Sequence, residues 1–290
     1  MDGPAATAHG TLWLVATPIG TVDDLSPRAR KVLAAADLVL AEDTRRTRAL
    51  LGRLGIASGQ RLLSLNEHNE SRRLPGVLER LAGGASVALV SDAGMPVLSD
   101  PGFLLVREAR ARGHAVLSVP GPSAFTAALA ASGQPPLPAT LAGFLPPRPG
   151  PRRRALERLA AVPGTLVLLV SPHRLAAELA DAAAVLGEDR PATLLAELSK
   201  LHERGTAATL GELARGPEAE NPRGEYVLVV GPAEVRDRSP VAAEAAKAYE
   251  QALAEGHPRP EALRRAARRL GIPRRRLYAL LEEARGGDRG

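Results

Sequence analysis

The 290-residue sequence contains no cysteine and very few aromatic residues. Without cysteine the chain can form neither disulfides, thiolate zinc sites nor a cysteine nucleophile. Because aromatic residues make up only 2% of the chain, its cores must be aliphatic. The longest apolar runs, such as Thr165–Val170, are strand-sized and too short to cross a bilayer. Residues 1–10 lack the basic start of a signal peptide. We therefore expect a cytoplasmic protein without membrane spans.

Common catalytic motifs are also missing. No G-x-G-x-x-G follows the first predicted strand, and neither G-x-x-x-x-G-K-[ST] nor G-x-S-x-G occurs anywhere. The hypotheses of a nicotinamide enzyme, a nucleoside-triphosphate enzyme and a serine hydrolase therefore lose support. Glu67, His68 and Glu70 lack the spacing of a metal-binding helix, which favours helix capping over metal binding. We expect no metal site.

The positive charge comes from arginine. The net charge is +6, and lysine occurs only at positions 31, 200 and 247. Arginine clusters at 152–154, 264–265, 268–269 and 274–276. Such clusters are either phosphate-binding surfaces or solvated helix faces in a sequence that uses arginine in place of lysine. Both interpretations remain open.

Residues 11–134 show five alternations of a short apolar run with a helical pattern. Polar, glycine- and proline-rich segments follow each run, which predicts a mainly parallel, doubly wound α/β domain with its site at the carboxyl ends of the strands. The predicted strands are Thr11–Ala16, Leu38–Ala41, Arg61–Leu65, Ser86–Val90 and Ala115–Val119.

The remaining chain divides into three parts. A Pro-rich segment, Gln134–Pro138, separates the first domain from a second α/β domain at 139–232, for which we expect a mixed sheet. Residues 146–151 are expected to be a loop before a basic helix at 152–160. Residues 1–10 are expected to be a flexible N-terminus. Residues 239–290 form a basic helical extension that resembles a helix-turn-helix, or alternatively packs as an appendage. The predicted core of the extension is Leu263, Ala266, Leu270, Leu277 and Leu280.

The segment Ser91–Gly102 stands out among the loops. It joins a strand to a helix and contains two Ser-Asp pairs, two glycines and two prolines, which together favour a rigid backbone. One interpretation is a ligand-binding wall. The other is a capped turn in which Asp100 is the N-cap of the helix and Pro101 its first residue.

Eight motifs occur in one order along residues 10–230. Together they resemble the bacterial ribosomal RNA small subunit methyltransferase I family, part of the tetrapyrrole-methylase superfamily. The motifs are Ala16–Gly20, Glu42–Arg45, Asn66–Glu70, Ser91–Gly102, Pro120–Ala124, Ser171–Arg174, Leu198–Glu203 and Arg223–Glu225.

The resemblance implies two α/β domains with S-adenosylmethionine in the cleft between them, a homodimer, and 2'-O-methylation of a cytidine in the decoding region of 16S ribosomal RNA. Two residues depart from the family pattern: Thr21 replaces asparagine, and Met95 replaces threonine. Side-chain bonds at these positions are therefore in doubt. The implied cofactor residues are Pro18, Gly20, Asp92, Ala93, Gly94, Met95, Ser123, Ala124, Ser171, Pro172 and Glu225.

Methyl transfer to a hydroxyl needs alignment and benefits from a general base. The candidates for the base are Asp100, Glu42, Glu67 and Lys200, with Asp43 and Glu70 also considered. Each of them also has a possible structural role, as a helix cap or an ion-pair partner. The candidate RNA contacts are Arg45, Arg46, Asn69, Arg148 and Arg174.

Two other functions remain open at this stage. One is a methylase that acts on a small tetrapyrrole, and the other is a non-catalytic RNA-binding protein of the ribosome.

Overall fold

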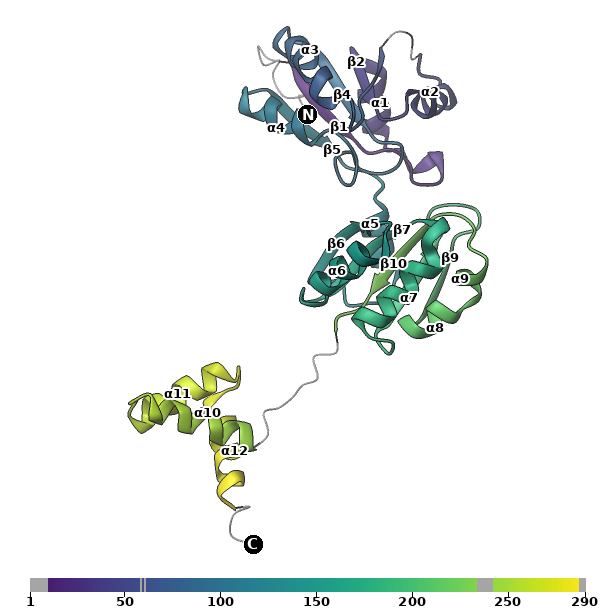
Figure 1. The fold of residues 1–290 in the computed structure, drawn as a ribbon. Coiled ribbons are helices and arrows are strands. Elements are labelled where there is room, and N and C mark those ends of the chain that lie inside the picture. Colours follow the sequence, from purple (N-terminus) through teal and green to yellow (C-terminus); the bar gives the residue numbers. More distant parts are fainter. Residues whose placement is uncertain (1–9, 58, 60, 234–241, 287–290) are drawn as a thin grey trace. The chain divides into compact units, whose positions relative to one another are not determined.

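The computed structural model describes residues 10–57, 59, 61–233 and 242–286 (Figure 1). The described residues fall into two compact units, the first ending at Ala233 and the second containing residues 242–286. The first unit holds two sheets, and the second consists of helices. The expectation of a flexible N-terminus falls almost wholly outside the described residues. No described helix has the length and hydropathy that crossing a membrane requires.

The first sheet is parallel throughout and has the strand order β3-β2-β4-β1-β5. The doubly wound parallel sheet is thus confirmed. Its strands are β1 (Thr11–Val15), β2 (Leu38–Ala41), β3 (Leu62–Ser64), β4 (Ser86–Val90) and β5 (Ala115–Val119). The intervening helices are α1 (Pro27–Ala35), α2 (Thr44–Arg53), α3 (Glu70–Ala82) and α4 (Phe103–Ala111), with a 3-10 turn at Val22–Asp24.

Alternating side chains of the first sheet enter two separate cores. Leu38 and Leu40 of β2 pack on the side of α3 and α4, whereas Val39 and Ala41 pack on the side of α1 and α2. This follows from the two-residue period of a strand. Both faces of the sheet are covered, so its loops meet solvent chiefly at the strand ends.

The second sheet is mixed, as expected, with the order β6-β7-β10-β8-β9. Only β6 and β7 pair in parallel, and the other neighbours are antiparallel. The strands are β6 (Ala139–Phe144), β7 (Thr165–Val170), β8 (Pro191–Ala196), β9 (Arg204–Thr209) and β10 (Tyr226–Val230).

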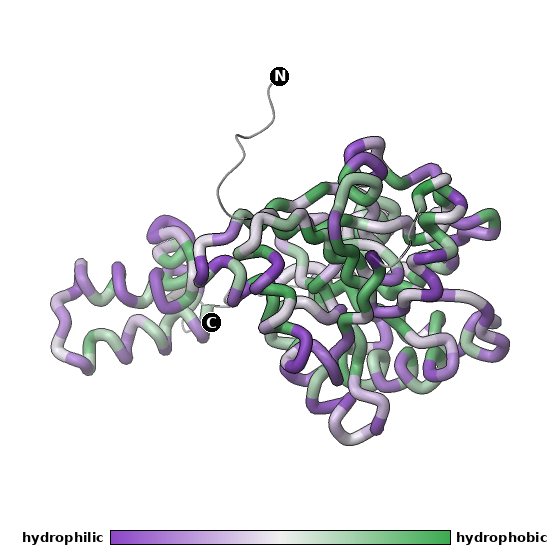
Figure 2. The backbone as a smooth tube through the Cα atoms, turned by 90° about the horizontal axis from the view of Figure 1, so that it is seen from above, coloured by the Kyte–Doolittle hydropathy of each residue, from purple (hydrophilic) through white to green (hydrophobic). Residues whose placement is uncertain are grey.

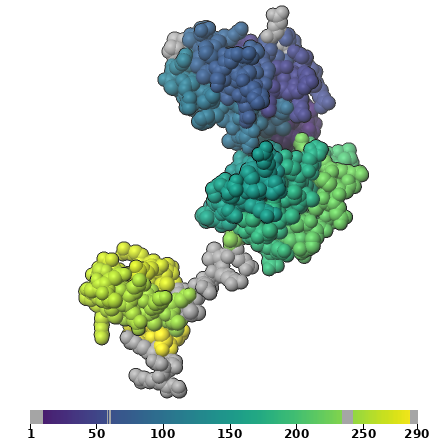
Figure 3. All heavy atoms as spheres, viewed as in Figure 1, coloured from purple at the N-terminus to yellow at the C-terminus, as the bar shows by residue number. Residues whose placement is uncertain are grey.

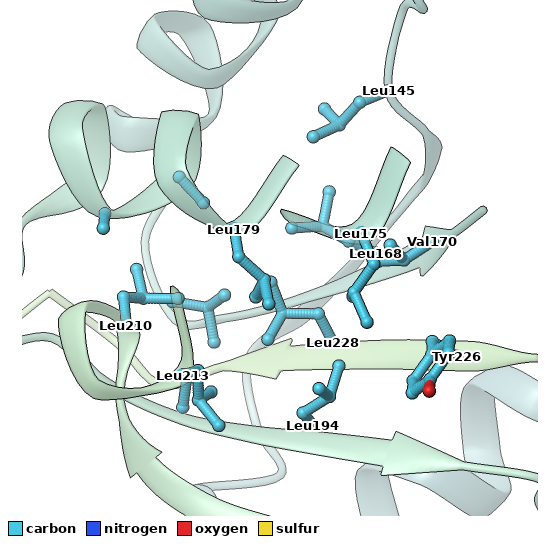
Figure 4. Close-up of a cluster of buried hydrophobic side chains, with 14 of the residues drawn as sticks. Leu145, Leu168, Val170, Leu175, Leu179, Leu194, Leu210, Leu213, Tyr226 and Leu228 are labelled. Carbon is cyan, nitrogen blue, oxygen red and sulfur yellow. The ribbon is translucent and has the colours of Figure 1, made fainter. Parts of the chain in front are cut away.

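One face of the second sheet packs against helices that connect its strands. These are α6 (Pro149–Ala160), α7 (Leu175–Leu186), α8 (Leu210–Arg215) and α9 (Pro217–Glu220). Leu168 and Leu228 from the sheet meet Leu175 and Leu179 from α7 in this core (Figure 4). The expected loop over 146–151 is wrong in its second half, because α6 begins at Pro149, a residue well suited to the first turn of a helix.

The opposite face of the second sheet is covered by α5 (Ala124–Ala131). Ala128 of this helix is fully buried against Val167 and Val229 of the second sheet. The boundary drawn from the sequence at residue 134 groups α5 with the first domain, but its packing groups it with the second. Figure 3 draws the atoms of the two domains, coloured purple to blue and teal to green.

The second unit contains three helices: α10 (Ala242–Ala254), α11 (Arg259–Arg269) and α12 (Arg274–Gly286). The expected core residues Ala266, Leu277 and Leu280 are buried, together with Ala245 and Ala248 of α10. Leu263 and Leu270 are partly buried at the same core. A four-residue turn joins α11 to α12, which is the helix-turn-helix connection expected from the sequence.

A buried ion pair joins α6 to α7. The Nε atom of Arg152 donates to Asp181 at 2.6 Å, and both side chains are nearly inaccessible, at 4% and 6% exposed. Arg153 donates to the other carboxylate oxygen at 2.7 Å, but its side chain is 60% exposed. The basic cluster at 152–154 is thus largely structural.

Replacing Asp181 with alanine should lower the free energy of unfolding by about 3–5 kcal/mol, because it removes the carboxylate bonded to the buried Arg152 guanidinium. Arg153→Gln removes only the exposed partner and should cost less than about 1 kcal/mol. Urea unfolding of both variants measures the difference. Equal costs would contradict this assignment of the buried pair.

Candidate active site

The loop Ser91–Gly102 is hydrogen-bonded to the residue after β1. Thr17 and Gly94 exchange both of their backbone hydrogen bonds, at 2.9 and 3.0 Å. The Thr17 hydroxyl also donates to the Ser91 carbonyl at 3.1 Å, and the Ser91 hydroxyl donates to the Gly94 carbonyl at 3.0 Å. Thr17 and Ser91 are both buried. These bonds fix the first half of the loop across the ends of two neighbouring strands.

The second half of the loop has an unusual backbone. Val97 and Ser99 have φ angles of 77° and 69°, in the left-handed region that side chains disfavour. Gly102 has a φ of 120°, and a Cβ atom there would lie 2.5 Å from Leu89 Cδ2. Gly102 occupies the N-cap position of α4, which begins at Phe103. The interpretation of Asp100 as this N-cap is therefore wrong.

Asp100 instead lines a cavity of about 420 Å³ within the first unit. The cavity is lined by the loop after β4, by the start of α5 and by residues of the second sheet, Leu169 and Tyr226 among them. All but two of the expected cofactor residues line it: Asp92, Ala93, Gly94, Met95, Ser123, Ala124, Ser171, Pro172 and Glu225. The two exceptions are Pro18 and Gly20.

Gly20 lies where two loops of the first unit touch. A Cβ atom at this position would collide with the carbonyl group of Ser199. The next residue, Thr21, donates its backbone N–H to that carbonyl at 2.9 Å. Ser199 in turn hydrogen-bonds to Asp24 through its hydroxyl. The departure at Thr21 therefore leaves a backbone contact in place, and Gly20 serves the approach of the two loops.

Two carboxylates of the cavity lining, Asp92 and Asp100, interact electrostatically with Glu42, which is not among the lining residues. Burial, followed by the negative charges of Glu42 and Asp92, raises the pKa of Asp100 to about 7. Burial and then Asp92 and Glu67 also raise the pKa of Glu42. Asp92 itself accepts hydrogen bonds from the Asp43 backbone N–H at 3.2 Å and from Arg46 at 3.1 Å. Asp100 is thus a carboxyl group that changes charge near neutral pH.

Asp43 has a local structural role. It is the N-cap of α2, accepting from the Arg45 N–H at 2.8 Å and from the Arg45 guanidinium at 2.8 Å. These hydrogen bonds lower the pKa of Asp43 to about 2. A carboxylate held in this way is a poor proton acceptor at neutral pH. The Arg45 side chain is 84% exposed, and Arg46 is 71% exposed beside Asp92.

Lys200 is not among the residues that line the cavity. Its ammonium group bridges Glu197 at 3.0 Å and Glu225 at 2.9 Å. Glu225 does line the cavity, and its backbone N–H donates to Glu197 at 2.7 Å. Lys200 therefore orients Glu225, which lines the cavity.

The Asn66–Glu70 motif is built around a hydrogen-bonded turn. The backbone N–H groups of Asn66 and Asn69 donate to each other's side-chain oxygens, at 2.9 and 3.1 Å. The side-chain oxygen of Asn69, an expected RNA contact, therefore already accepts a hydrogen bond within the turn. Glu67 is exposed and does not line the cavity.

Glu70 caps a helix other than its own. Its side chain is buried, and one carboxylate oxygen accepts the backbone N–H of Leu105 at 3.1 Å. Leu105 is in the first turn of α4, whose N-cap, Gly102, has no side chain to do this. Glu70 therefore supplies the missing cap and anchors the end of the loop that carries Asp100.

The two remaining basic candidates differ in their surroundings. Arg174 donates to the buried Glu178 at 2.7 Å, and Arg148 is exposed at the N-cap position of α6. Sequence reasoning did not single out the apolar wall of the cavity. Three of its residues lie within recognised motifs but have no polar group to mark them, and the other five are ordinary strand and helix residues. The apolar wall consists of Ile19, Leu98, Phe125, Leu141, Phe144, Leu169, Leu198 and Val227.

Residues 11–214 match the family model of tetrapyrrole (corrin/porphyrin) methylases. The chain belongs to the tetrapyrrole methylase family. It is also 45% identical over 273 residues to the ribosomal RNA small subunit methyltransferase I of Xylella fastidiosa, covering 93% of this chain and 98% of that protein. The enzyme of the same name from Pseudomonas aeruginosa is 43% identical over 272 residues, covering 93% and 95%.

Two solved structures share the fold. A uroporphyrin-III C-methyltransferase from Thermus thermophilus is 26% identical, with a TM-score of 0.52, over 77% of this chain and 94% of that one. Diphthine synthase has a TM-score of 0.58 at 18% identity, covering 77% and 90%. The α/β architecture expected from the sequence is thereby confirmed.

Replacing Glu70 with alanine should lower the free energy of unfolding by about 1–3 kcal/mol, because the buried Leu105 N–H loses its acceptor. Glu70→Gln keeps an acceptor oxygen and should cost less. The control is Glu67→Ala, an exposed carboxylate of the same motif, which should stay within about 0.5 kcal/mol. Urea unfolding that ranks Glu67→Ala with Glu70→Ala would contradict the capping role.

Proposed function

We propose that this protein uses S-adenosylmethionine to methylate the ribose 2'-hydroxyl of a cytidine in the decoding region of 16S ribosomal RNA. The observation that carries the proposal is the Asp100 carboxyl group, whose pKa is raised to about 7, in a cavity of about 420 Å³. Identity of 45% to a ribosomal RNA small subunit methyltransferase I along nearly the full chain supports the substrate class.

The cavity suits the cofactor in size and in composition. About 420 Å³ falls within the range of sites that enclose small molecules. Phe125, Leu141 and Phe144 offer an apolar surface suited to a purine ring, whereas Asp92 and Glu225 can complement a cation. Gly94, with a φ of 81°, lets the backbone approach a ligand closely. When bound, S-adenosylmethionine supplies a methyl group that is already activated for transfer.

The residues of the chain then have two tasks. The rigid loop Ser91–Gly102 must hold the reacting groups in line, since positioning alone can lower the barrier substantially. Asp100 accepts the proton that the ribose hydroxyl loses when its oxygen gains the methyl group. A carboxylate with a pKa of about 7 is better matched to this transfer than an ordinary aspartate. Glu42 and Asp92 support this role by raising the pKa of Asp100.

Methylation of purified small ribosomal subunits with methyl-labelled cofactor tests the proposal. Label in a 2'-O-methylcytidine of 16S ribosomal RNA is the expected result, and absence of label from every ribose would refute it. Porphyrin acceptors test the alternative of a small-molecule methylase. Cofactor binding by calorimetry tests the alternative of a non-catalytic RNA-binding protein, which predicts no binding.

We also infer that the protein acts as a cytoplasmic homodimer. The support is the family resemblance, together with exposed apolar side chains such as Leu201, which is 93% exposed. Analytical ultracentrifugation of the full chain measures the oligomeric state.

Asp100→Asn should reduce kcat by about 10²–10⁴-fold, the usual contribution of a positioned general base. Cofactor affinity should change by less than about fivefold, because the amide keeps the shape of the side chain. Single-turnover methylation and calorimetry measure the two quantities. A variant with near-normal kcat would exclude Asp100 as the base.

The pH dependence should follow the ionisation of Asp100. Only the carboxylate accepts a proton, so kcat/KM for the cofactor should be maximal above pH 7 and fall toward tenfold per unit below it. Glu42→Gln removes a neighbouring negative charge and should move the midpoint to lower pH. An unchanged or higher midpoint in this variant would contradict the coupling of the two acids.

A further inference from the structure

The second unit carries an unusual density of positive charge. Between Arg259 and Arg276 the sequence contains eight arginines and a single acid, Glu261. All eight arginines are exposed. The cluster at 152–154 differs, because Asp181 binds two of its members. The stretch from Arg259 to Arg276 therefore has a large excess of positive charge, and the other described acids of the second unit lie on α10 and α12 or just after α10.

Four of these arginines gather on one side of α11. Arg264 and Arg268 are four residues apart, as are Arg265 and Arg269, so each pair lies along one side of the helix. The buried residues Ala262, Ala266 and Ala267 occupy the other side, at the core with α10 and α12. In the C-terminal helices of Figure 2, hydrophilic and hydrophobic stretches alternate along the tube. The helix thus presents a mainly basic face to solvent.

This face borders a hollow of about 600 Å³. The same four arginines line it, together with Glu255 and Glu261. Arg265 contacts Glu261 at 3.3 Å, and Arg269 contacts Glu255 at 3.4 Å. These carboxylates are 42% exposed, and exposed ion pairs of this kind are weak. These pairs orient the Arg265 and Arg269 guanidinium groups but leave them able to bind a phosphate. Arg264 and Arg268 form no ion pair with the described residues.

We propose that the four arginines of α11, aided by Arg274–Arg276 at the start of α12, bind the phosphate backbone of ribosomal RNA. Guanidinium groups recognise phosphate oxygens through paired N–H donors, a geometry that lysine lacks. Such contacts fix the position of a protein on a nucleic acid without reading its sequence. The inference rests on the proposed function: the cavity in the first unit selects the nucleotide, and the basic face of α11 adds affinity for the RNA that carries it.

Phosphate contacts make binding depend steeply on salt, because each one releases condensed counterions. The slope of log K against log salt concentration is negative. Removing four contacts should make it less steep by about 3. An apolar or shape-based contact would leave this slope unchanged. The slope therefore distinguishes the proposed interface from other ways in which the helices could bind.

The test compares two full-length variants that each lose four positive charges. The first is Arg264→Gln, Arg265→Gln, Arg268→Gln and Arg269→Gln. The control is Arg53→Gln, Arg80→Gln, Arg112→Gln and Arg158→Gln, which changes exposed arginines near the ends of helices in the first unit. Binding to a 16S ribosomal RNA fragment and to small subunits is measured between 50 and ~300 mM salt.

The α11 variant should bind the RNA fragment at least about tenfold more weakly, with the slope less steep by about 3, and the control should stay within about twofold. Replacing the same four residues with lysine should restore the salt slope but only part of the affinity, because lysine keeps the charge and lacks the paired donors. Equal losses in both variants, or none in the first, would overturn the proposal. So would lost binding to small subunits with unchanged binding to RNA, which indicates a ribosomal protein as partner.

Two further measurements separate this inference from the proposed function. Calorimetry should show normal cofactor binding by the α11 variant, and circular dichroism should show its helices intact. If the unsubstituted protein binds RNA with the expected slope but methylates no ribose, the proposed function fails and the basic face stands. If it methylates ribose and the α11 variant does so equally well at all salt concentrations, only the basic face fails.

Discussion

The pair of backbone hydrogen bonds between Thr17 and Gly94 is the constraint on which the site depends. β1 and β4 are adjacent and in register, with Val15 opposite Val90, so the segments after them emerge side by side. The hydrogen bonds extend this pairing beyond the sheet and fix the start of the loop as one side of the cavity. The Ser91 and Thr17 hydroxyls satisfy nearby carbonyls, which lets the start of the loop be buried without unpaired polar groups.

The far end of the loop is held differently, by packing and by a distant cap. Gly102 fits against Leu89 only because it has no side chain, and Glu70 replaces the cap that Gly102 cannot provide. These restraints maintain the disfavoured backbone at Val97 and Ser99. They also hold Asp100 where burial, followed by the negative charges of Glu42 and Asp92, raises its pKa. The disfavoured backbone of Val97 and Ser99 thus lies within three residues of Asp100, the residue proposed to take the proton.

The first sheet and its polar loops could be predicted from the sequence, because short apolar runs that alternate with helical patterns are typical of parallel strands. The packing of α5 was not predictable: Ala-rich on all sides, it carries no polar face that would say which sheet it covers. The cap that Glu70 provides spans 35 residues, and the bridge from Lys200 to Glu225 depends on two loops meeting. Such contacts follow from tertiary structure and leave no local pattern.

Above all, the loop Ser91–Gly102 holds Asp100 in surroundings that raise the pKa of its carboxyl group to about 7. Titrating the full-length chain with its aspartate carboxyl carbons labelled for NMR measures this directly, with Asp100→Asn assigning the signal. The account predicts a midpoint of about 7 for Asp100, against about 2 for Asp43 in the same spectrum. A midpoint for Asp100 near 4, the value of an ordinary exposed aspartate, would contradict it.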